Sequence, residues 1–350
     1  MRRPASTDGH SGPSVVVPQT SFLGDVVLTT PLVTALRQRL RPRRLVVMVR
    51  PEARVLVEGH PDVDGVLIDD KHGADRGPLG ALAVARRLRR ERFDVAVVPH
   101  RSLRTALIVA AARIPRRIGF DVSRGAWLFH ERVSRDLRQH DIERNLALMA
   151  PFGGMETTPA LHIAVQPSGA ERARALVPPG AAPLVVMAPG SVWATKRWTP
   201  EGFAMVGRAL AERGARVVLV GAAGDVAAAE RVVALAGFGI ISLAGRTDLA
   251  TTVAVIDRAA VLIGNDSAPI HIACARAVPV VAVFCATTPA LGYGPRGEHS
   301  RVVQVDLDCR PCGRHGGRHC PRGTDDCMRL VEPERVLAAV YDVWRPDVAA

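Results

Sequence analysis

Residues 14–36 read SVVVPQTSFLGDVVLTTPLVTAL, in which a strand pattern is followed by a turn and by a helix pattern. The valine run that ends at Pro18 is typical of a buried strand, and the apolar segment after Asp25 is long enough for a helix. The turn between the two holds Asp25. A strand, a turn and a helix in this order begin a β-α-β unit, so the sequence predicts a parallel sheet covered by helices on both faces.

The same alternation recurs along the chain. In the first half, valine-rich runs are followed by turns and by a segment with helical spacing at 79–92; the runs lie at 14–18, 44–50, 65–69 and 94–99. Proline and glycine concentrate between about 151 and 182. Beyond them the alternation restarts, with runs at 183–190, 215–221, 260–266 and 278–284.

We therefore predict an α/β protein with two similar domains. The predicted parts are a loose leader at 1–12, a first domain at 13–165, a linker at 166–182, a second domain at 183–332, and a C-terminal helix and tail at 333–350. Two such halves predict a cleft between them. Ligands of such sheets bind beyond the carboxyl ends of the strands.

Asp25 follows the carboxyl end of the first predicted strand. Its helix begins either at Asp25 or at Pro31 with Thr30 as the N-cap, because proline is favoured in a first turn. Two roles for Asp25 stay open at this point. The carboxylate either caps the helix and interacts with its dipole, or serves as a general base at a ligand site.

Charge is distributed unevenly. The net charge is +12, and residues 1–150 hold 26 lysines and arginines against 16 acidic residues, which leaves +10 in that half. Such a field attracts nucleic acid, acidic lipid surfaces or a phosphorylated saccharide, unless the arginines only form a solvated surface. Aromatic residues make up only 4% of the chain, which disfavours nucleic acid as a partner.

No stretch has the length of a membrane span, and the N-terminus lacks the apolar region of a secretory signal. We therefore expect a cytoplasmic protein. Six cysteines are too few for a disulfide scaffold in a chain of 350 residues. Cys309, Cys312, Cys320 and Cys327 are nevertheless clustered, and their alternatives are a structural zinc site, reduced thiols or a facultative disulfide.

A second candidate site lies at the start of the second domain. There a predicted strand is followed by a loop with Gly190, Ser191, Thr195 and Lys196, and then by a helix that begins near Thr199 or Pro200. Backbone N–H groups and hydroxyls of such a loop bind phosphate, and a lysine adds a compact charge. The chain has 44 arginines and only two lysines, which favours a specific role for this one over a chance surface position.

The block IGNDSAPIH at 263–271 has the same organisation. A predicted strand ends at Gly264 and turns into a helix whose N-terminus can bind an anion. Asp266 or Ser267 could equally cap that helix, and His271 could pack against the sheet.

Together these blocks resemble the glycosyltransferase family 9 heptosyltransferases. The resemblance spans nearly the whole chain and rests on FLGDVVLTTPLVTALR at 22–37, HDIERN at 140–145, PGSVWATKRW at 189–198, LVGAAGD at 219–225, LAGRTDL at 243–249, IGNDSAPIHIA at 263–273 and the cysteine-rich segment from 309. It implies a GT-B fold with two Rossmann-like domains, the first for the acceptor and the second for ADP-heptose.

The resemblance also implies an inverting, metal-independent transfer of heptose to the lipopolysaccharide inner core, without a cofactor. Asp25 would be the base, and Lys196 would stabilise the departing diphosphate. The implied nucleotide-sugar residues are Gly190, Ser191, Thr195, Asp225, Thr247, Leu249, Asn265, Asp266, Ser267, His271 and Thr287. Among them Asp225 would contact the ribose, Thr247 and Leu249 would lie near the adenine, and Asp266 would contact the sugar hydroxyls.

The acceptor would carry phosphates and acidic sugars and would lie at the inner face of the cytoplasmic membrane, where the enzyme would be peripheral. Gly24, Arg50, His100 and Arg101 are the residues expected to bind it, with Arg104 nearby, and no nucleic acid is expected. The alternatives are a family 9 transferase that uses another nucleotide sugar, a nucleotide-sugar epimerase of similar architecture, and a noncatalytic basic binding protein.

Overall fold

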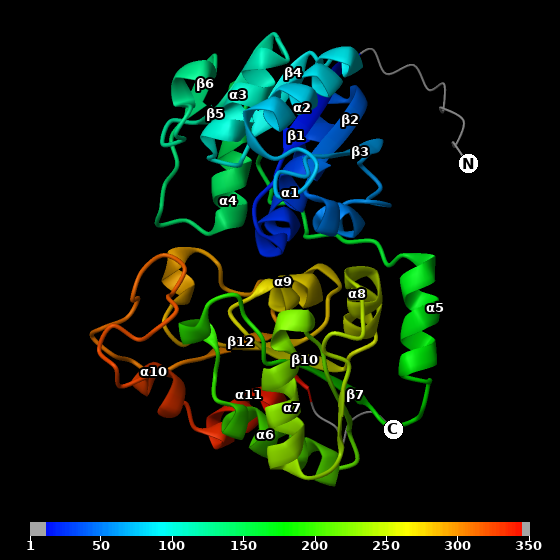
Figure 1. The fold of residues 1–350 in the computed structure, drawn as a ribbon, viewed down its shortest axis with the longest axis vertical. Coiled ribbons are helices and arrows are strands. Elements are labelled where there is room, and N and C mark those ends of the chain that lie inside the picture. The colour runs from blue at the N-terminus through cyan, green and yellow to red at the C-terminus, as the bar shows by residue number, and fades with distance from the viewer. Residues whose placement is uncertain (1–11, 345–350) are drawn as a thin grey trace. The chain divides into compact units, whose positions relative to one another are not determined.

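The structure is a computed structural model that describes residues 12–344 (Figure 1). The chain divides into two compact units between Ala164 and Val165. We call them the N-terminal unit and the C-terminal unit. The predicted leader lies outside the described residues except for Gly12, which begins the first strand.

The N-terminal unit contains one parallel sheet in the order β3-β2-β1-β4-β5-β6. Its strands are β1 (Gly12–Pro18), β2 (Pro42–Val49), β3 (Gly65–Ile68), β4 (Val95–Val98), β5 (Arg116–Phe120) and β6 (Glu131–Val133). The register pairs Val15 of β1 with Leu45 of β2 and with Val95 of β4. This is the strand order of a Rossmann fold, in which the sequence runs outward in both directions from β1 and β4.

The C-terminal unit repeats that topology with the order β12-β11-β10-β7-β8-β9. Its strands are β7 (Leu184–Ala188), β8 (Arg216–Leu219), β9 (Ile240–Ser242), β10 (Val261–Asn265), β11 (Val280–Val283) and β12 (Ser300–Val303). All of its strand pairs are parallel. The predicted α/β fold with two Rossmann-like halves is therefore confirmed.

Helices cover both sheets. The N-terminal unit has α1 (Leu23–Leu40), α2 (Gly77–Glu91), α3 (Leu103–Ala111) and α4 (Asp141–Leu146). The C-terminal unit has α5 (Pro167–Leu176), α6 (Pro200–Glu212), α7 (Val226–Ala236), α8 (Leu249–Asp257), α9 (Ala268–Ala275), α10 (Asp326–Arg329) and α11 (Pro333–Val343). Within residues 12–344 no helix is both long and apolar enough to cross a membrane.

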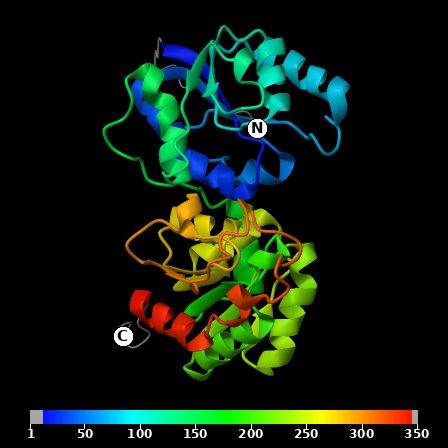
Figure 2. The same cartoon turned by 90° about the vertical axis from the view of Figure 1, so that its left-hand side faces the viewer.

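The core of the N-terminal unit follows from strand periodicity. Val16, Val46 and Ala96 point to the face covered by α2 and α3, because alternate strand residues point the same way. Helices α1 and α4 pack together. Figure 2 shows α1 and α4, in dark blue and green, on the side of the strands opposite to the cyan α2 and α3.

Helix α1 differs from both predicted starts. It begins at Leu23, before Asp25, and it continues through Pro31. Proline lacks the N–H that would bond the carbonyl of Val27, and the hydroxyl of Thr30 donates to that carbonyl instead, at 2.9 Å. The same hydroxyl accepts from the N–H of His162 at 3.1 Å. Thr30 is therefore a helix residue that compensates for Pro31, and not an N-cap.

The predicted linker at 166–182 also differs, because it contains α5. Pro167 occupies the first turn of this helix, where proline is favoured. Gly169 lets α5 approach α8 closely, since a Cβ there would lie 2.4 Å from the carbonyl oxygen of Ala250. The proline and glycine that indicate a loop in the sequence instead begin and pack a helix.

Candidate active site

In each unit, polar residues gather where the strand order reverses. In the N-terminal unit that point lies between β1 and β4, and Thr20 Oγ1 lies 3.1 Å from Nδ1 of His100 across it. In the C-terminal unit it lies between β7 and β10, where Nδ2 of Asn265 donates to the carbonyl of Pro189 at 2.8 Å. Carboxyl ends of strands diverge at such a point and leave room for a ligand.

Asp25 lies in the first turn of α1, next to Gly24. Its carboxylate accepts a hydrogen bond from Oγ of Ser21 at 2.5 Å and one from the N–H of Phe22 at 3.2 Å. Burial raises the pKa of Asp25 to about 6, and the nearby charge of Asp141 acts in the same direction. A carboxyl group with this pKa is both a helix cap and suited to accept a proton near neutral pH.

The charge near Asp25 is that of Asp141, which lies in the HDIERN segment at 140–145. Asp141 is buried and forms an ion pair with Arg135, which is also buried. Asn145 donates from Nδ2 to Asp141 at 3.4 Å and to the carbonyl of Leu28 in α1 at 3.3 Å. This motif therefore joins α4 to the helix that carries Asp25, a role that the sequence alone did not reveal.

Cations surround His100 at the same edge of the N-terminal sheet. Burial lowers the pKa of His100 to about 3, and the charges of Lys71, Arg101 and Arg50 lower it further, so the imidazole is neutral. Lys71 donates to the carbonyl of Thr20 at 2.6 Å. Sequence reasoning missed Lys71 because it lies in a loop after β3 with no recognisable motif.

Arg104 is less available for a ligand. It forms an ion pair with the buried Asp69 at 2.8 Å and also donates to the carbonyl oxygens of Asp75 and Gly77. Arg50 pairs with Glu52 at 2.9 Å, an acid that is largely exposed. The predicted acceptor residues Arg50, His100 and Arg101 are thus brought together with Lys71, whereas Arg104 holds the loop after β3.

In the C-terminal unit, Lys196, Asp266 and Thr287 form one buried cluster. Nζ of Lys196 lies 2.6 Å from Oδ2 of Asp266, and the hydroxyl of Thr287 donates to the same oxygen at 2.7 Å. Lys196 also donates to the carbonyl of Asp266 at 3.3 Å. These residues follow β7, β10 and β11, so the fold delivers all three to one edge of the sheet.

Other predicted nucleotide-sugar residues form hydrogen bonds at this edge of the sheet. Asn265 is buried, and its side chain accepts from the N–H of Trp198 at 2.9 Å as well as donating to Pro189. The carbonyl of Ser191 accepts two hydrogen bonds from Arg197. Oγ of Ser267 lies 3.4 Å from the carbonyl of Gly190. The side-chain amide of Asn265 therefore joins the end of β10 to the loop that follows β7.

The predicted ribose and adenine residues occupy two neighbouring loops. Asp225 accepts from the N–H of Ala222 at 3.0 Å, and a Cβ on Gly190 would lie 2.2 Å from its carboxylate carbon. Thr247 shares a hydrogen bond of 2.9 Å with Thr252 in α8, which begins at Leu249. His271 is buried in α9. Asp225 is thus brought next to Gly190, while His271 packs within the fold.

Thr195 is hydrogen-bonded to the cysteine-rich segment. Its hydroxyl accepts from the N–H of Gly317 at 2.8 Å and lies 3.1 Å from the Gly317 carbonyl, which also accepts from the Thr195 N–H. The cysteine-rich segment is fixed at a second point, because the N–H of Cys312 donates to the carbonyl of Ala286 at 2.9 Å. Ala286 in turn donates to the carbonyl of Thr195. The segment therefore holds the residues just before Lys196 and Thr287.

The four clustered cysteines do not form a metal site among residues 12–344, where no group of three or more His, Cys, Asp or Glu side chains is arranged to hold an ion. All six cysteines are free thiols. Arg310 anchors the segment by donating to the carbonyl oxygens of Phe284 and Thr287. The geometry thus gives this segment a packing role, and the zinc site stays a prediction.

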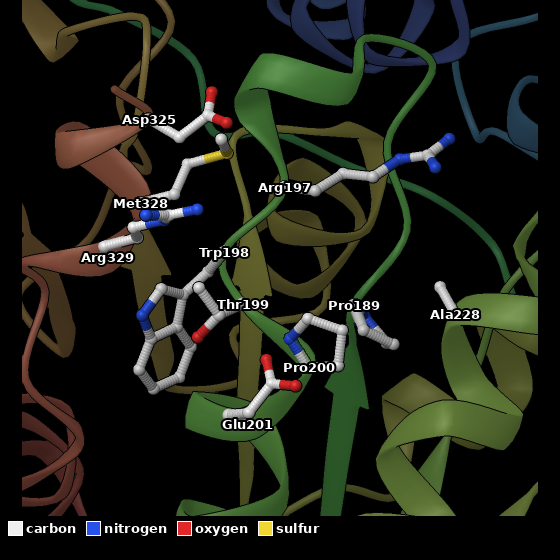
Figure 3. A pocket seen from close by; sticks show the side chains of 10 residues that line it. All are labelled: Pro189, Arg197, Trp198, Thr199, Pro200, Glu201, Ala228, Asp325, Met328 and Arg329. Atoms are coloured by element: carbon white, nitrogen blue, oxygen red, sulfur yellow. The ribbon is translucent and has the colours of Figure 1, made fainter. Parts of the chain in front are cut away.

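A hollow of about 380 Å³ lies beside this edge, between the start of α6 and α10. Figure 3 shows Thr199, Pro200 and Glu201 on one side of it and Met328 and Arg329 on the other. Its lining does not include Lys196, Asp266 or Thr287. The hollow is therefore separate from the buried cluster.

Two Rossmann-like units, each a parallel sheet whose strand order reverses at its centre, are the architecture of the GT-B fold. The chain belongs to glycosyltransferase family 9 (heptosyltransferase), whose family model matches residues 81–319. Membership in this family identifies the protein as an enzyme, which argues against the noncatalytic binding protein and gives no support to the epimerase.

Similar proteins span nearly the whole chain. Lipopolysaccharide heptosyltransferase 2 of Salmonella typhimurium is 27% identical over 351 residues, covering 94% of this chain and 98% of that protein. A glycosyl transferase family 9 structure from Veillonella parvula matches with a TM-score of 0.84 and 22% identity over 95% and 97% of the two chains. E. coli ADP-heptose lps heptosyltransferase II matches with a TM-score of 0.79 and 22% identity over 94% and 98%.

Replacing Asp25 with asparagine tests the cost of its buried charge. A carboxyl group whose pKa rises from 3.8 to about 6 on folding binds more protons in the folded state, so stability falls as pH rises between these values. Asparagine can keep the acceptor oxygen without the charge. We expect the melting temperature of Asp25→Asn to exceed that of the wild type above pH 6 and the difference to vanish below 3.8. The exposed Asp121→Asn is the control; an equal, pH-independent shift in both would contradict the interpretation.

Breaking the Lys196–Asp266 pair should destabilise the C-terminal unit. Lys196→Met leaves a buried carboxylate without its cation, which costs about 3 kcal/mol or more. Adding Asp266→Asn removes that charge and should restore a large part of the loss in urea unfolding. Arg208→Met breaks the exposed pair with Glu212 and should cost less than about 1 kcal/mol. If the double variant is no more stable than Lys196→Met, the pair is not the source of the loss.

Proposed function

We propose that this protein transfers heptose from ADP-heptose to the lipopolysaccharide inner core with inversion at the anomeric carbon and without a metal ion. The observation that carries the proposal is the pair of strand edges, one bearing Asp25 and the other bearing Lys196 with Asp266 and Thr287. The names of the heptosyltransferase relatives support the donor and the acceptor.

In this proposal Lys196 serves the leaving group. The diphosphate gains negative charge as the bond to the sugar breaks, and a fixed ammonium in a site shielded from water stabilises that charge strongly. Lys196 is already held in place by Asp266. The backbone N–H groups of the Gly190–Ser191 loop and the start of α9 after Ser267 would add further donors.

Asp266 and Thr287 are proposed to orient the sugar, and Asp225 the ribose. Asp266 uses Oδ2 for Lys196 and Thr287. Its Oδ1 would accept from a sugar hydroxyl. Thr195 is assigned to positioning Lys196 in place of direct phosphate contact, because its hydroxyl already bonds Gly317.

Asp25 is proposed as the general base. Inverting transfer needs one carboxylate that accepts the proton of the attacking hydroxyl on the face opposite the leaving group. A pKa of about 6 places Asp25 in its ionised form at neutral pH and keeps it basic enough to take the proton.

Lys71, Arg50 and Arg101 are proposed to bind an anionic acceptor. Burial lowers the pKa of Lys71, and the charge of Arg50 lowers it further. An entering phosphate or acidic sugar would relieve the repulsion among these cations. A family 9 transferase that uses another nucleotide sugar remains the second candidate, and the donor assay below separates the two.

The function is tested by incubating the protein with ADP-heptose and a delipidated inner-core acceptor in the presence of a chelator. We expect ADP release and acceptor elongation, with kcat/KM falling below an apparent pKa of about 6 as Asp25 becomes protonated. Asp25→Asn should lower turnover by at least about 100-fold, as for loss of a general base. It should leave ADP binding unchanged.

Other nucleotide sugars serve as the control donors. Elongation with one of them and not with ADP-heptose would replace the proposed donor, and full activity of Asp25→Asn would remove the proposed base. Turnover that stops with the chelator and returns with a divalent metal would contradict metal independence.

The contact between the cysteine-rich segment and Lys196 gives a separate prediction. Gly316 and Gly323 have φ of +74° and +71°, so alanine adds similar backbone strain at both. A Cβ at Gly316 would lie 2.9 Å from Oγ1 of Thr195 and 3.2 Å from Cγ of Lys196, whereas Gly323 has no such neighbours within 4 Å. We expect Gly316→Ala to weaken ADP binding by about tenfold in calorimetry and Gly323→Ala to change it little. Equal losses would mean that the segment does not position Lys196.

A further inference from the structure

We propose that the face formed by α2, α3 and the turn at 121–128 docks on an anionic membrane surface. This proposal rests on one part of the proposed function, namely that the acceptor is a saccharide linked to a lipid. Exposed apolar side chains that gather on one face of a domain are unusual and mark an interaction site.

Exposed large apolar residues concentrate on this face of the N-terminal unit. Leu79 is 82% exposed and Trp127 is 66% exposed. The full set on these elements is Leu79, Leu82, Leu103, Leu107, Val122 and Trp127. Of the exposed large apolar residues described in this unit, only Phe22 and Leu137 lie elsewhere.

These residues belong to adjoining elements. Leu79 and Leu82 are one helical turn apart on α2, and α2 packs beside α3. Leu103 of α3 contacts the turn, because its Cδ1 lies 3.3 Å from the place a Cβ on Gly125 would take. Trp127 follows two residues later. The three elements that carry the exposed apolar residues therefore adjoin one another.

Positive charge continues this surface along α2. Arg86, Arg89, Arg90 and Arg92 are exposed and line a hollow of about 450 Å³. None of their side chains forms an ion pair with the described part of the chain, whereas the neighbouring Arg87 pairs with Asp75 at 2.7 Å. The acid of this helix, Glu91, is itself paired with Arg44 at 2.6 Å. The four arginines thus carry a charge that the fold does not neutralise.

Apolar side chains next to arginines, with an exposed tryptophan, match the chemistry of a lipid interface. Leucines insert among acyl chains, tryptophan prefers the headgroup level, and arginines bind anionic headgroups. A nucleic acid would need several stacking aromatic residues, and this face has Trp127 alone. An anionic bilayer is therefore the partner that uses all of these residues.

The position of this face relative to the acceptor residues supports the same partner. Arg104 at the start of α3 donates to the carbonyl of Gly77 at the start of α2, at 3.0 Å, and pairs with Asp69 just after β3. The apolar end of both helices thus adjoins the strand edge that bears Lys71 and His100. A saccharide attached to a lipid could reach this edge while its anchor stays in the membrane.

The test measures binding of the full chain to vesicles by sedimentation. We expect binding to vesicles of phosphatidylglycerol and phosphatidylcholine that weakens with salt, and little binding to phosphatidylcholine alone. Because one arginine near an anionic surface contributes roughly fivefold to binding, Arg89→Gln with Arg90→Gln should weaken it about 25-fold. The matched control, Arg132→Gln with Arg174→Gln, neutralises two exposed arginines elsewhere and should change binding less than about twofold.

A second variant tests the apolar part, since Leu79→Ser with Leu82→Ser should weaken vesicle binding without changing its salt dependence. Wild type that fails to sediment with anionic vesicles, or equal losses in the two arginine pairs, would overturn the proposal, as would binding to nucleic acid in place of vesicles. Turnover of the delipidated acceptor should be unchanged in the Arg89→Gln, Arg90→Gln variant. Absence of that turnover in the wild type would instead count against the proposed function.

Discussion

In each unit the strand order reverses once, beside β1 and beside β7, and this reversal determines where polar side chains gather. Parallel strands need crossover helices, and the reversal sends consecutive helices to opposite faces of the sheet. The loops on either side of it therefore diverge at the carboxyl edge. Asp25 and His100 in one unit, and Lys196 and Asp266 in the other, lie in or directly after those loops.

Burial shifts the pKa values of two of these polar groups, Asp25 and His100. Asp25 is kept weakly acidic by burial and by Asp141, while His100 is kept neutral by burial and three neighbouring cations. Nζ of Lys196 lies 2.6 Å from the buried carboxylate of Asp266. Shifted pKa values such as those of Asp25 and His100 are typical of sites that bind or react.

The sequence was sufficient to predict elements whose residue pattern and contacts are local. Valine runs identified the central strands, and the helix predicted to begin near Thr199 or Pro200 begins at Pro200. Thr199 is its N-cap, because its hydroxyl accepts from the Gly202 N–H. Short or charged strands escaped notice, such as Glu131–Val133 and Ile240–Ser242, because three residues carry too little periodicity. The position of Lys71 and the contacts of Thr195 were not predicted, because they depend on segments far apart in the chain. Lys71 contacts Thr20, and Thr195 contacts Gly317.

The hydroxyl of Thr30 joins two features that are otherwise far apart in the sequence. It fills the gap left by Pro31 in α1 and accepts from His162, two residues before the N-terminal unit ends. The backbone just before Val165 is therefore hydrogen-bonded to the same helix that carries Asp25.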